Sequence, residues 1–152
     1  MQDEYFFVSF DAQIIYSGNV EHAPLGVEFL INDTKYLDTP LEDFMSFKFI
    51  VRDTEDTYKL NFILKNKSLS QTQCDSSGNI IGDTLLEIKN IQIDNVCLDE
   101  ILYEKANYTH MKNTESSDHA TSESFCGTMG CNGSVEFTFE SPFYVWLLEN
   151  MN

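Results

Sequence analysis

Cationic side chains are scarce in this sequence. Nine Lys and Arg residues stand against 25 Asp and Glu, so the formal charge is −16 at pH 7, and Arg52 is the single arginine. A chain with this balance is repelled by nucleic-acid phosphates and by anionic lipid surfaces. We therefore expect neither nucleic acid nor membrane among its partners. The charge instead suits a basic protein partner or divalent cations.

Catalytic motifs and a secretion signal are also missing. The sequence contains no P-loop, dinucleotide-binding glycine fingerprint, nucleophile elbow or zinc-protease helix, and it has only three histidines. Its first residues lack a basic region, and no apolar run approaches the roughly 18 residues that span a bilayer. We predict a protein that is not an enzyme and is not secreted through a signal peptide.

Cysteine is too sparse for a disulfide framework. The four cysteines, Cys74, Cys97, Cys126 and Cys131, are typical of free thiols in a reducing compartment. A bridge between Cys126 and Cys131 is the alternative in an oxidising environment.

The sequence does contain many aromatic residues, and they recur in alternating patterns. Twelve Phe and seven Tyr supply a large apolar surface. Apolar residues alternate with polar ones over residues 27–31, 47–51, 58–64 and 135–139, which predicts strands with one buried face. The polar residues 52–57 predict a hairpin turn between the second and third of these strands.

The buried phase slips twice between residues 84 and 98. A slip of one residue turns the buried face outward unless a bulge or turn intervenes, so we expect a bulge near Asn90 and a tight turn at Asp94-Asn95. Residues 99–105 suit a short helix. Residues 144–150 suit either a second short helix or a closing strand.

These patterns together predict an all-β fold. We expect residues 1–152 to form a single antiparallel β-sandwich domain, jelly-roll-like, with at most one or two short helices. The polar, acidic segment from about 112 to 124 predicts a flexible loop. Trp146 lies between apolar neighbours and is expected in the core.

Two acidic segments are candidate calcium sites, because calcium binds six to eight oxygen ligands. One holds Asp53, Glu55 and Asp56, and the other lies between Asp75 and Asp83. The same residue types are ordinary turn formers, so turns without metal are the alternative. We expect that no cofactor is required and that calcium is the one cofactor these loops allow.

Exposed tyrosines on a sandwich can stack on sugar rings through their amphipathic ring faces. Tyr36, Tyr103 and Tyr108 are the candidates for such glycan stacking. The segment 127–133 is rich in glycine but precedes a strand rather than a helix, so it predicts a turn or bulge and not a phosphate-binding loop.

A resemblance to known proteins is carried by three parts of the chain: residues 64–67 with 72–80, residues 88–94, and residues 127–133 with 142–151. From about residue 44 to the C-terminus the chain resembles small proteins encoded by marine tailed phages, notably those of cyanobacteria. It also looks like the β-sandwich of carbohydrate-binding modules, including calcium-dependent xylan-binding ones. The phage resemblance implies synthesis in the cytoplasm of a bacterial host and incorporation into a virion.

Two functions follow as expectations. The first is an accessory virion structural protein, such as a head decoration or a tail or fibre component, whose partners are viral structural proteins or further copies of itself. The alternative is a carbohydrate-binding module that recognises a polysaccharide of the host surface, with or without calcium. An assembly protein should expose a contiguous apolar patch or an unpaired edge strand, whereas a lectin-like module should expose a shallow aromatic groove.

Overall fold

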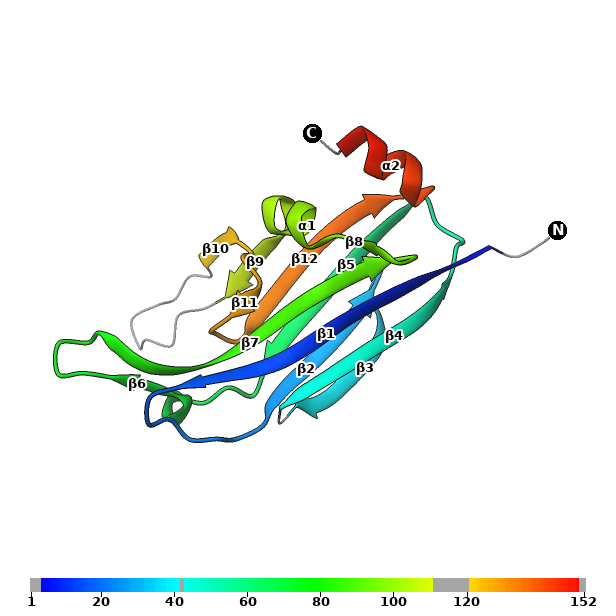
Figure 1. Cartoon of the computed structure of the whole chain (residues 1–152). Coiled ribbons are helices and arrows are strands. Elements are labelled where there is room, and N and C mark those ends of the chain that lie inside the picture. Colours follow the sequence, from blue (N-terminus) through cyan, green and yellow to red (C-terminus); the bar gives the residue numbers. More distant parts are fainter. Residues whose placement is uncertain (1–3, 42, 111–120, 151–152) are drawn as a thin grey trace.

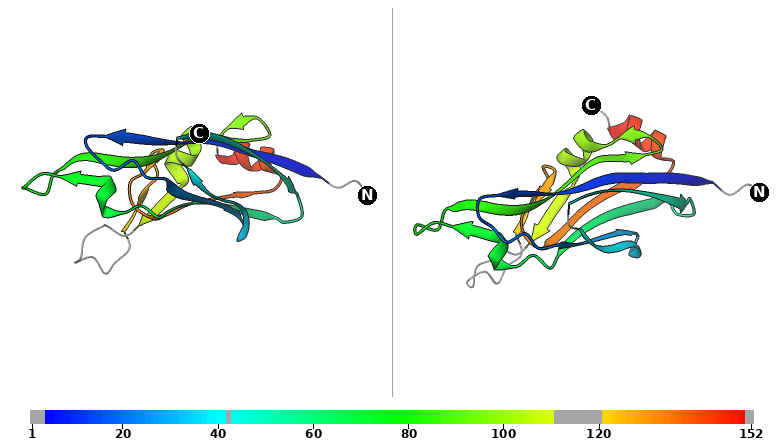
Figure 2. Two further views of the ribbon diagram at one scale, coloured as in Figure 1. Left: turned by 90° about the horizontal axis from the view of Figure 1, so that it is seen from below. Right: turned by 60° about the horizontal axis from the view of Figure 1, so that its bottom comes forward.

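The computed structural model describes residues 4–41, 43–110 and 121–150, and they form two antiparallel sheets packed face to face (Figures 1 and 2). In the first sheet β1 (Tyr5–Ser17) lies between β4 (Phe44–Arg52) and β7 (Ile80–Ile93). Strand β7 also pairs with three short strands, β6 (Thr72–Cys74), β8 (Val96–Cys97) and β11 (Thr128–Met129).

The second sheet has the order β10-β9-β12-β5-β2-β3. Its strands are β10 (Thr121–Ser124), β9 (Asn107–His110), β12 (Gly133–Glu140), β5 (Thr57–Lys65), β2 (Leu25–Ile31) and β3 (Thr34–Leu41). Two short α-helices, α1 (Asp99–Lys105) and α2 (Phe143–Asn150), and one 3-10 turn, η1 (Leu69–Gln71), complete the described elements. The prediction of an all-β sandwich with at most two short helices is confirmed.

The core lies between the sheets and is aromatic. The ring of Phe10 on β1 meets the rings of Phe29 and Phe62 on the second sheet edge-on, each at a centroid distance of 5.0 Å. All three side chains are at most 1% exposed. Edge-to-face pairs add to the stabilisation that burial gives, because the ring edge and the ring face carry opposite partial charges. Trp146 is also in the core, as predicted, with 9% of its surface exposed.

The predicted hairpin around residues 52–57 is wrong. Strand β4 pairs with β1 in the first sheet, whereas β5 pairs with β2 and β12 in the second. The connection therefore crosses from one sheet to the other, and the hydroxyl of Tyr58 holds it by accepting the backbone N–H groups of Thr54 and Glu55 at 2.8 and 3.0 Å. Alternation identified both strands, but strands that face one core from opposite sheets show the same pattern.

The predicted bulge and turn in β7 and after it are both confirmed. The register with β1 shifts between Ser9 and Asp11, opposite Asn90, whose φ of 52° is left-handed. Asp94 and Asn95 also have positive φ, 49° and 69°, and they join β7 to β8. Two successive left-handed residues are typical of a type I′ hairpin turn, which matches the twist of the flanking strands.

The remaining local predictions have mixed outcomes. Residues 99–105 are helical, and the C-terminal segment is a helix rather than a strand. Of the loop predicted from about 112 to 124, residues 111–120 lie outside the described residues, and Thr121–Ser124 are not loop but strand β10, paired with β9. Threonine favours strands although it is polar, so a polar segment can still form one. No disulfide joins Cys126 to Cys131. No helix of the described chain is long and apolar enough to cross a membrane.

Candidate functional site

The outer face of the first sheet carries apolar side chains where polar ones are expected. Tyr5 and Phe7 on β1 are 53% and 40% exposed, and Ile50 on β4, directly opposite Phe7, is 62% exposed. At the start of β4, Phe44 shares the outward phase of Ile50 and is 48% exposed. We call the surface formed by Tyr5, Phe7 and Ile50 the β1–β4 strip. Exposed apolar side chains that lie together in this way are typical of interaction surfaces.

The same surface borders an unpaired sheet edge. Within the described residues β4 is a terminal strand of its sheet and pairs with β1 alone. It is nine residues long and contains neither proline nor an acidic residue. Its two cations are Arg52 and Lys48, and the ammonium of Lys48 lies 4.9 Å from the ring centroid of Phe7. A long apolar edge with free backbone groups is a template for another strand.

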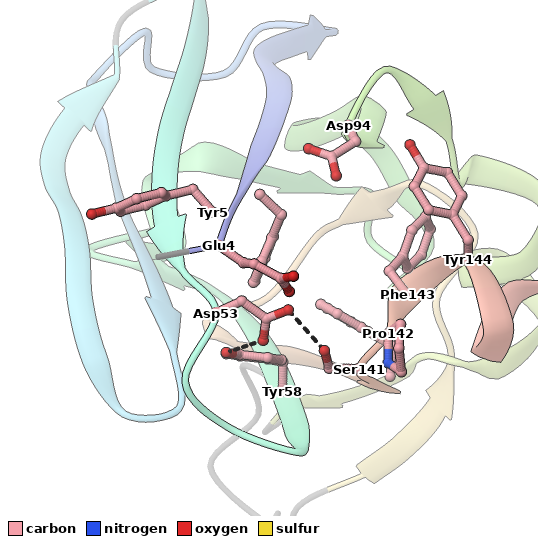
Figure 3. Close-up of a pocket in the computed structure, with 11 residues that line it drawn as sticks. Glu4, Tyr5, Asp53, Tyr58, Asp94, Ser141, Pro142, Phe143 and Tyr144 are labelled. Atoms are coloured by element: carbon pink, nitrogen blue, oxygen red, sulfur yellow. Dashed lines mark hydrogen bonds between the residues drawn. The ribbon is translucent and has the colours of Figure 1, made fainter. Parts of the chain in front are cut away.

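A pocket of about 290 Å³ opens where the β1–β4 strip ends (Figure 3). Tyr5 belongs to both the strip and the pocket. The lining comes from five places: the start of β1, the crossing after β4, the start of β5, the turn after β7 and the junction of β12 with α2. The lining residues are Glu4, Tyr5, Phe6, Asp53, Tyr58, Asp94, Phe139, Ser141, Pro142, Phe143 and Tyr144.

The pocket combines carboxylates with aromatic rings. Asp53 is held by two donors, the hydroxyl of Tyr58 at 2.9 Å and the hydroxyl of Ser141 at 2.8 Å. Asp94 accepts the backbone N–H of Phe7 at 2.8 Å and leaves its second oxygen outside that bond. Glu4 supplies a third carboxyl group, and the described lining holds no Lys, Arg or His. The pocket is therefore electronegative.

The floor of the pocket is built by the core. Phe6, Tyr58 and Phe139 are at most 6% exposed and stack or meet edge-on at 5.0 to 5.9 Å. Burial raises the pKa of Tyr58 above its ordinary value of 10.0, so its hydroxyl remains protonated and donates to Asp53 throughout the neutral range. At the rim, Tyr144 is 53% exposed, as is Tyr5. The cavity thus has a rigid aromatic base and an acidic rim.

The predicted calcium residues do not come together. Asp53 lies in the pocket, whereas Glu55 and Asp56 are exposed beside it. Asp75 accepts the backbone N–H groups of Ser77 and Asn79 in its own turn, and these bonds lower its pKa.

Asp83 forms an ion pair with Lys67 at 2.6 Å. Each of the predicted ligands in the second segment therefore has a structural partner. No group of three or more His, Cys, Asp or Glu among the described residues is placed to hold a metal ion.

The predicted glycan-stacking tyrosines each pack against a different neighbour. Tyr36 on β3 meets Phe49 edge-on at 5.8 Å and closes the side of the core next to β4. Tyr103 on α1 meets Phe125 at 5.7 Å, and burial raises its pKa to about 12. These two rings are half-buried and lie on separate elements.

Tyr108 is not an exposed ring, contrary to the prediction. It is 4% exposed, and its hydroxyl accepts the N–H of Cys131 at 2.8 Å and donates to the carbonyl of the same residue. The alternation of β9 turns Tyr108 inward, where the hydroxyl fixes the turn before β12. None of the three tyrosines lines the pocket.

The strip and the pocket were both missed from the sequence. Tyr5, Asp94, Ser141 and Tyr144 come from segments as far apart as the two ends of the chain, so no local spacing joins them. One signal was present: residues 5–8 are apolar without alternation. A strand that faces solvent on one side does not need apolar residues in both phases.

Comparisons with known proteins identify no family for this chain. No protein-family model, no curated protein and no solved structure matches the chain. The resemblance to cyanophage proteins and to carbohydrate-binding modules stays a prediction.

Proposed function

We propose that this chain is a non-catalytic assembly protein, an accessory structural component of a tailed-phage virion that docks through the β1–β4 strip and the adjoining β4 edge. The observation that carries the proposal is the exposed apolar surface beside the unpaired edge of β4. Ile50 is 62% exposed although its neighbour across the strand pair, Phe7, is also apolar and exposed. A partner that covered both would remove their apolar surface from water.

Edge pairing and side-chain burial would act together in this docking. A strand added to β4 would satisfy its free backbone groups, while its alternate side chains would cover the outer face. The partner is a viral structural protein or a second copy of this chain. A contact of this kind needs no catalytic group, no metal and no exposed sugar platform. It fits the sandwich fold, the acidic surface and the resemblance to phage proteins.

The test is incorporation into particles, measured by mass spectrometry of gradient-purified virions. Hundreds of copies for each particle would identify a head decoration, and a handful would identify a tail or fibre component. Absence from particles carrying every major structural protein would refute the proposal.

A matched pair of variants examines the surface itself. Ile50→Lys places a charge on the β1–β4 strip. Ile80→Lys places the same charge on the β6–β7 hairpin, at a residue whose exposure of 63% matches the 62% of Ile50. We expect Ile50→Lys to lower the copy number at least several-fold and Ile80→Lys to leave it unchanged. Equal effects of the two substitutions would contradict docking through β4.

A further inference from the structure

We infer that the pocket beside the β1–β4 strip receives a cationic side chain, a lysine or arginine of a basic partner protein. The inference rests on the proposed docking function. Of the two partners proposed there, it selects a basic viral structural protein, because a second copy of this chain carries −16. The pocket is continuous with the strip through Tyr5, which belongs to both, and Asp94 in the pocket accepts the backbone N–H of Phe7 in the strip. A partner lying along the strip would therefore reach the pocket with its next residues.

Charge complementarity selects a cation. The rim carries Glu4, Asp53 and Asp94, and the described lining contains no cation that neutralises them. The whole chain carries −16 at pH 7, so its net charge also favours association with a basic partner. An acidic or phosphorylated segment would be repelled by the net charge of the chain at long range and by the pocket carboxylates at contact.

The aromatic walls suit the same occupant. Lysine and arginine have an apolar stem and a charged end, and the end interacts favourably with the face of an aromatic ring. Tyr144 is 53% exposed at the rim, and the ring of Phe143, whose centroid lies 5.6 Å from that of Tyr144, is 7% exposed. A volume of about 290 Å³ accommodates one such side chain but is small for a typical drug-sized ligand. A neutral sugar would leave the carboxylates without a cation.

The carboxylate Asp53 is already fixed in place. Its two oxygens are held by separate hydroxyl groups, from Tyr58 on β5 and from Ser141 after β12, so it does not need to reorganise when a cation enters. A charge that is oriented before binding contributes more than one that must first be ordered. Asp94 is the better residue to change, because its substitution leaves the Tyr58–Asp53–Ser141 connection intact.

The experiment uses two small probes and amide chemical shifts of the full chain. Nα-acetyl-arginine amide carries the guanidinium, and Nα-acetyl-citrulline amide is its neutral analogue of nearly the same shape. We expect the arginine probe to shift the amides of Asp94, Ser141 and Tyr144 with millimolar affinity. The citrulline probe should bind at least about fivefold more weakly, and raising the ionic strength from about 0.01 to about 1 M should weaken the arginine probe, because the screening length falls from about 30 to about 3 Å.

Asp94→Asn and Asp33→Asn form the matched pair of variants. Both positions have positive φ, 49° and 67°, a conformation that asparagine tolerates, and the Asp33 carboxylate is 85% exposed outside the pocket. The amide group introduced by Asp94→Asn keeps an oxygen that accepts the Phe7 N–H, so the substitution removes the charge and retains this hydrogen bond. We expect Asp94→Asn to weaken the arginine probe about two- to fivefold and Asp33→Asn to change it less than twofold.

Several outcomes would overturn the inference: equal affinity of the two probes, shifts confined to other surfaces, no effect of Asp94→Asn, or no binding at tens of millimolar. A neutral glycan that shifts these amides when the arginine probe does not would also overturn it and point to a sugar site. These measurements use no virion. A failure here therefore stays distinct from a failure of the docking proposal, which is read from particle incorporation of Ile50→Lys.

Discussion

Replacing Lys67 by methionine is expected to destabilise the fold by about 3 kcal/mol. The side chain of Lys67 is 0% exposed, and its ammonium lies 2.6 Å from Oδ1 of Asp83. It also donates to the carbonyl oxygen of Gly130, in the turn before β12. Methionine fills a similar volume but donates nothing. The substitution would leave a largely buried carboxylate without its cation.

The size of the expected loss of stability depends on the hydrogen bonds that Asp83 retains in the variant. Breaking a buried ion pair by removing one partner costs about 3–5 kcal/mol. Asp83 still accepts the hydroxyl of Thr72 and the backbone N–H of Thr84, both at 2.8 Å, and its side chain is 17% exposed. These remaining contacts place the expected loss at the lower end, about 3 kcal/mol, which is a large part of the roughly 5–15 kcal/mol typical of a folded domain.

Urea unfolding at neutral pH, followed by far-ultraviolet circular dichroism, measures the loss. Lys59→Met is the control, because Lys59 is 36% exposed and its ion pairs at 3.7 and 3.9 Å lie at the surface, where removal costs about 1 kcal/mol or less. The double variant Lys67→Met/Asp83→Asn should recover part of the loss, since an amide does not need a cation. A loss below about 1 kcal/mol for Lys67→Met, or strict additivity in the double variant, would refute this reasoning.

Two further predictions concern local features of the first sheet and the surface charges. Asp99→Ala should lower the free energy of unfolding, measured in urea, by about 1–3 kcal/mol. The Asp99 carboxylate accepts the backbone N–H groups of Asn90 and Ile91 at 2.9 and 2.8 Å, and these bonds satisfy the backbone of the bulge. A loss within error of zero would contradict this role. Stability should also fall in acid. Hydrogen bonds from Ser46 and Asn90 lower the pKa of Asp11 from 3.8, and hydrogen bonds from Lys65 and Lys35 lower the pKa of Asp38 from the same value. The stabilisation from these two carboxylates is therefore present above pH 3.8 and is lost as the pH falls through the lowered pKa values. Unfolding measured at about pH 7, 4 and 2.5 checks the sign, and Asp38→Asn should flatten the decline.

Sequence reasoning succeeded where structure is set by neighbouring residues. The turn at Asp94-Asn95 and the bulge at Asn90 were both predicted because the buried phase slipped at these points. The structure shows left-handed backbone at all three residues, which asparagine and aspartate tolerate. The helix at residues 99–105 was also predicted from the local sequence. These features need no knowledge of which strand lies alongside.

Which strands pair with each other could not be predicted from local sequence patterns. Phe49 on β4 and Phe62 on β5 both face the core, so alternation is equally satisfied whether their strands pair or lie in opposite sheets. The crossing is stabilised instead by Tyr58, whose side chain points into the core while its hydroxyl reaches back to the connection. A phenol three or four residues after the backbone N–H groups that it accepts has no distinctive sequence pattern. The same limit hid the pocket, which depends on how the two sheets meet.

The departure from alternation in β1 and β4 is the feature that joins sequence to proposed function. Phe6 and Val8 supply the inward face of β1, so the outward Tyr5 and Phe7 are not required to close the core. Opposite them, Val51 faces inward and Ile50 outward. A sheet with one solvated face gains no stability from apolar residues there, and an apolar edge strand carries a risk of unwanted association. Their presence is understandable if a partner covers this face, and the acidic pocket at its end then restricts which partner can do so.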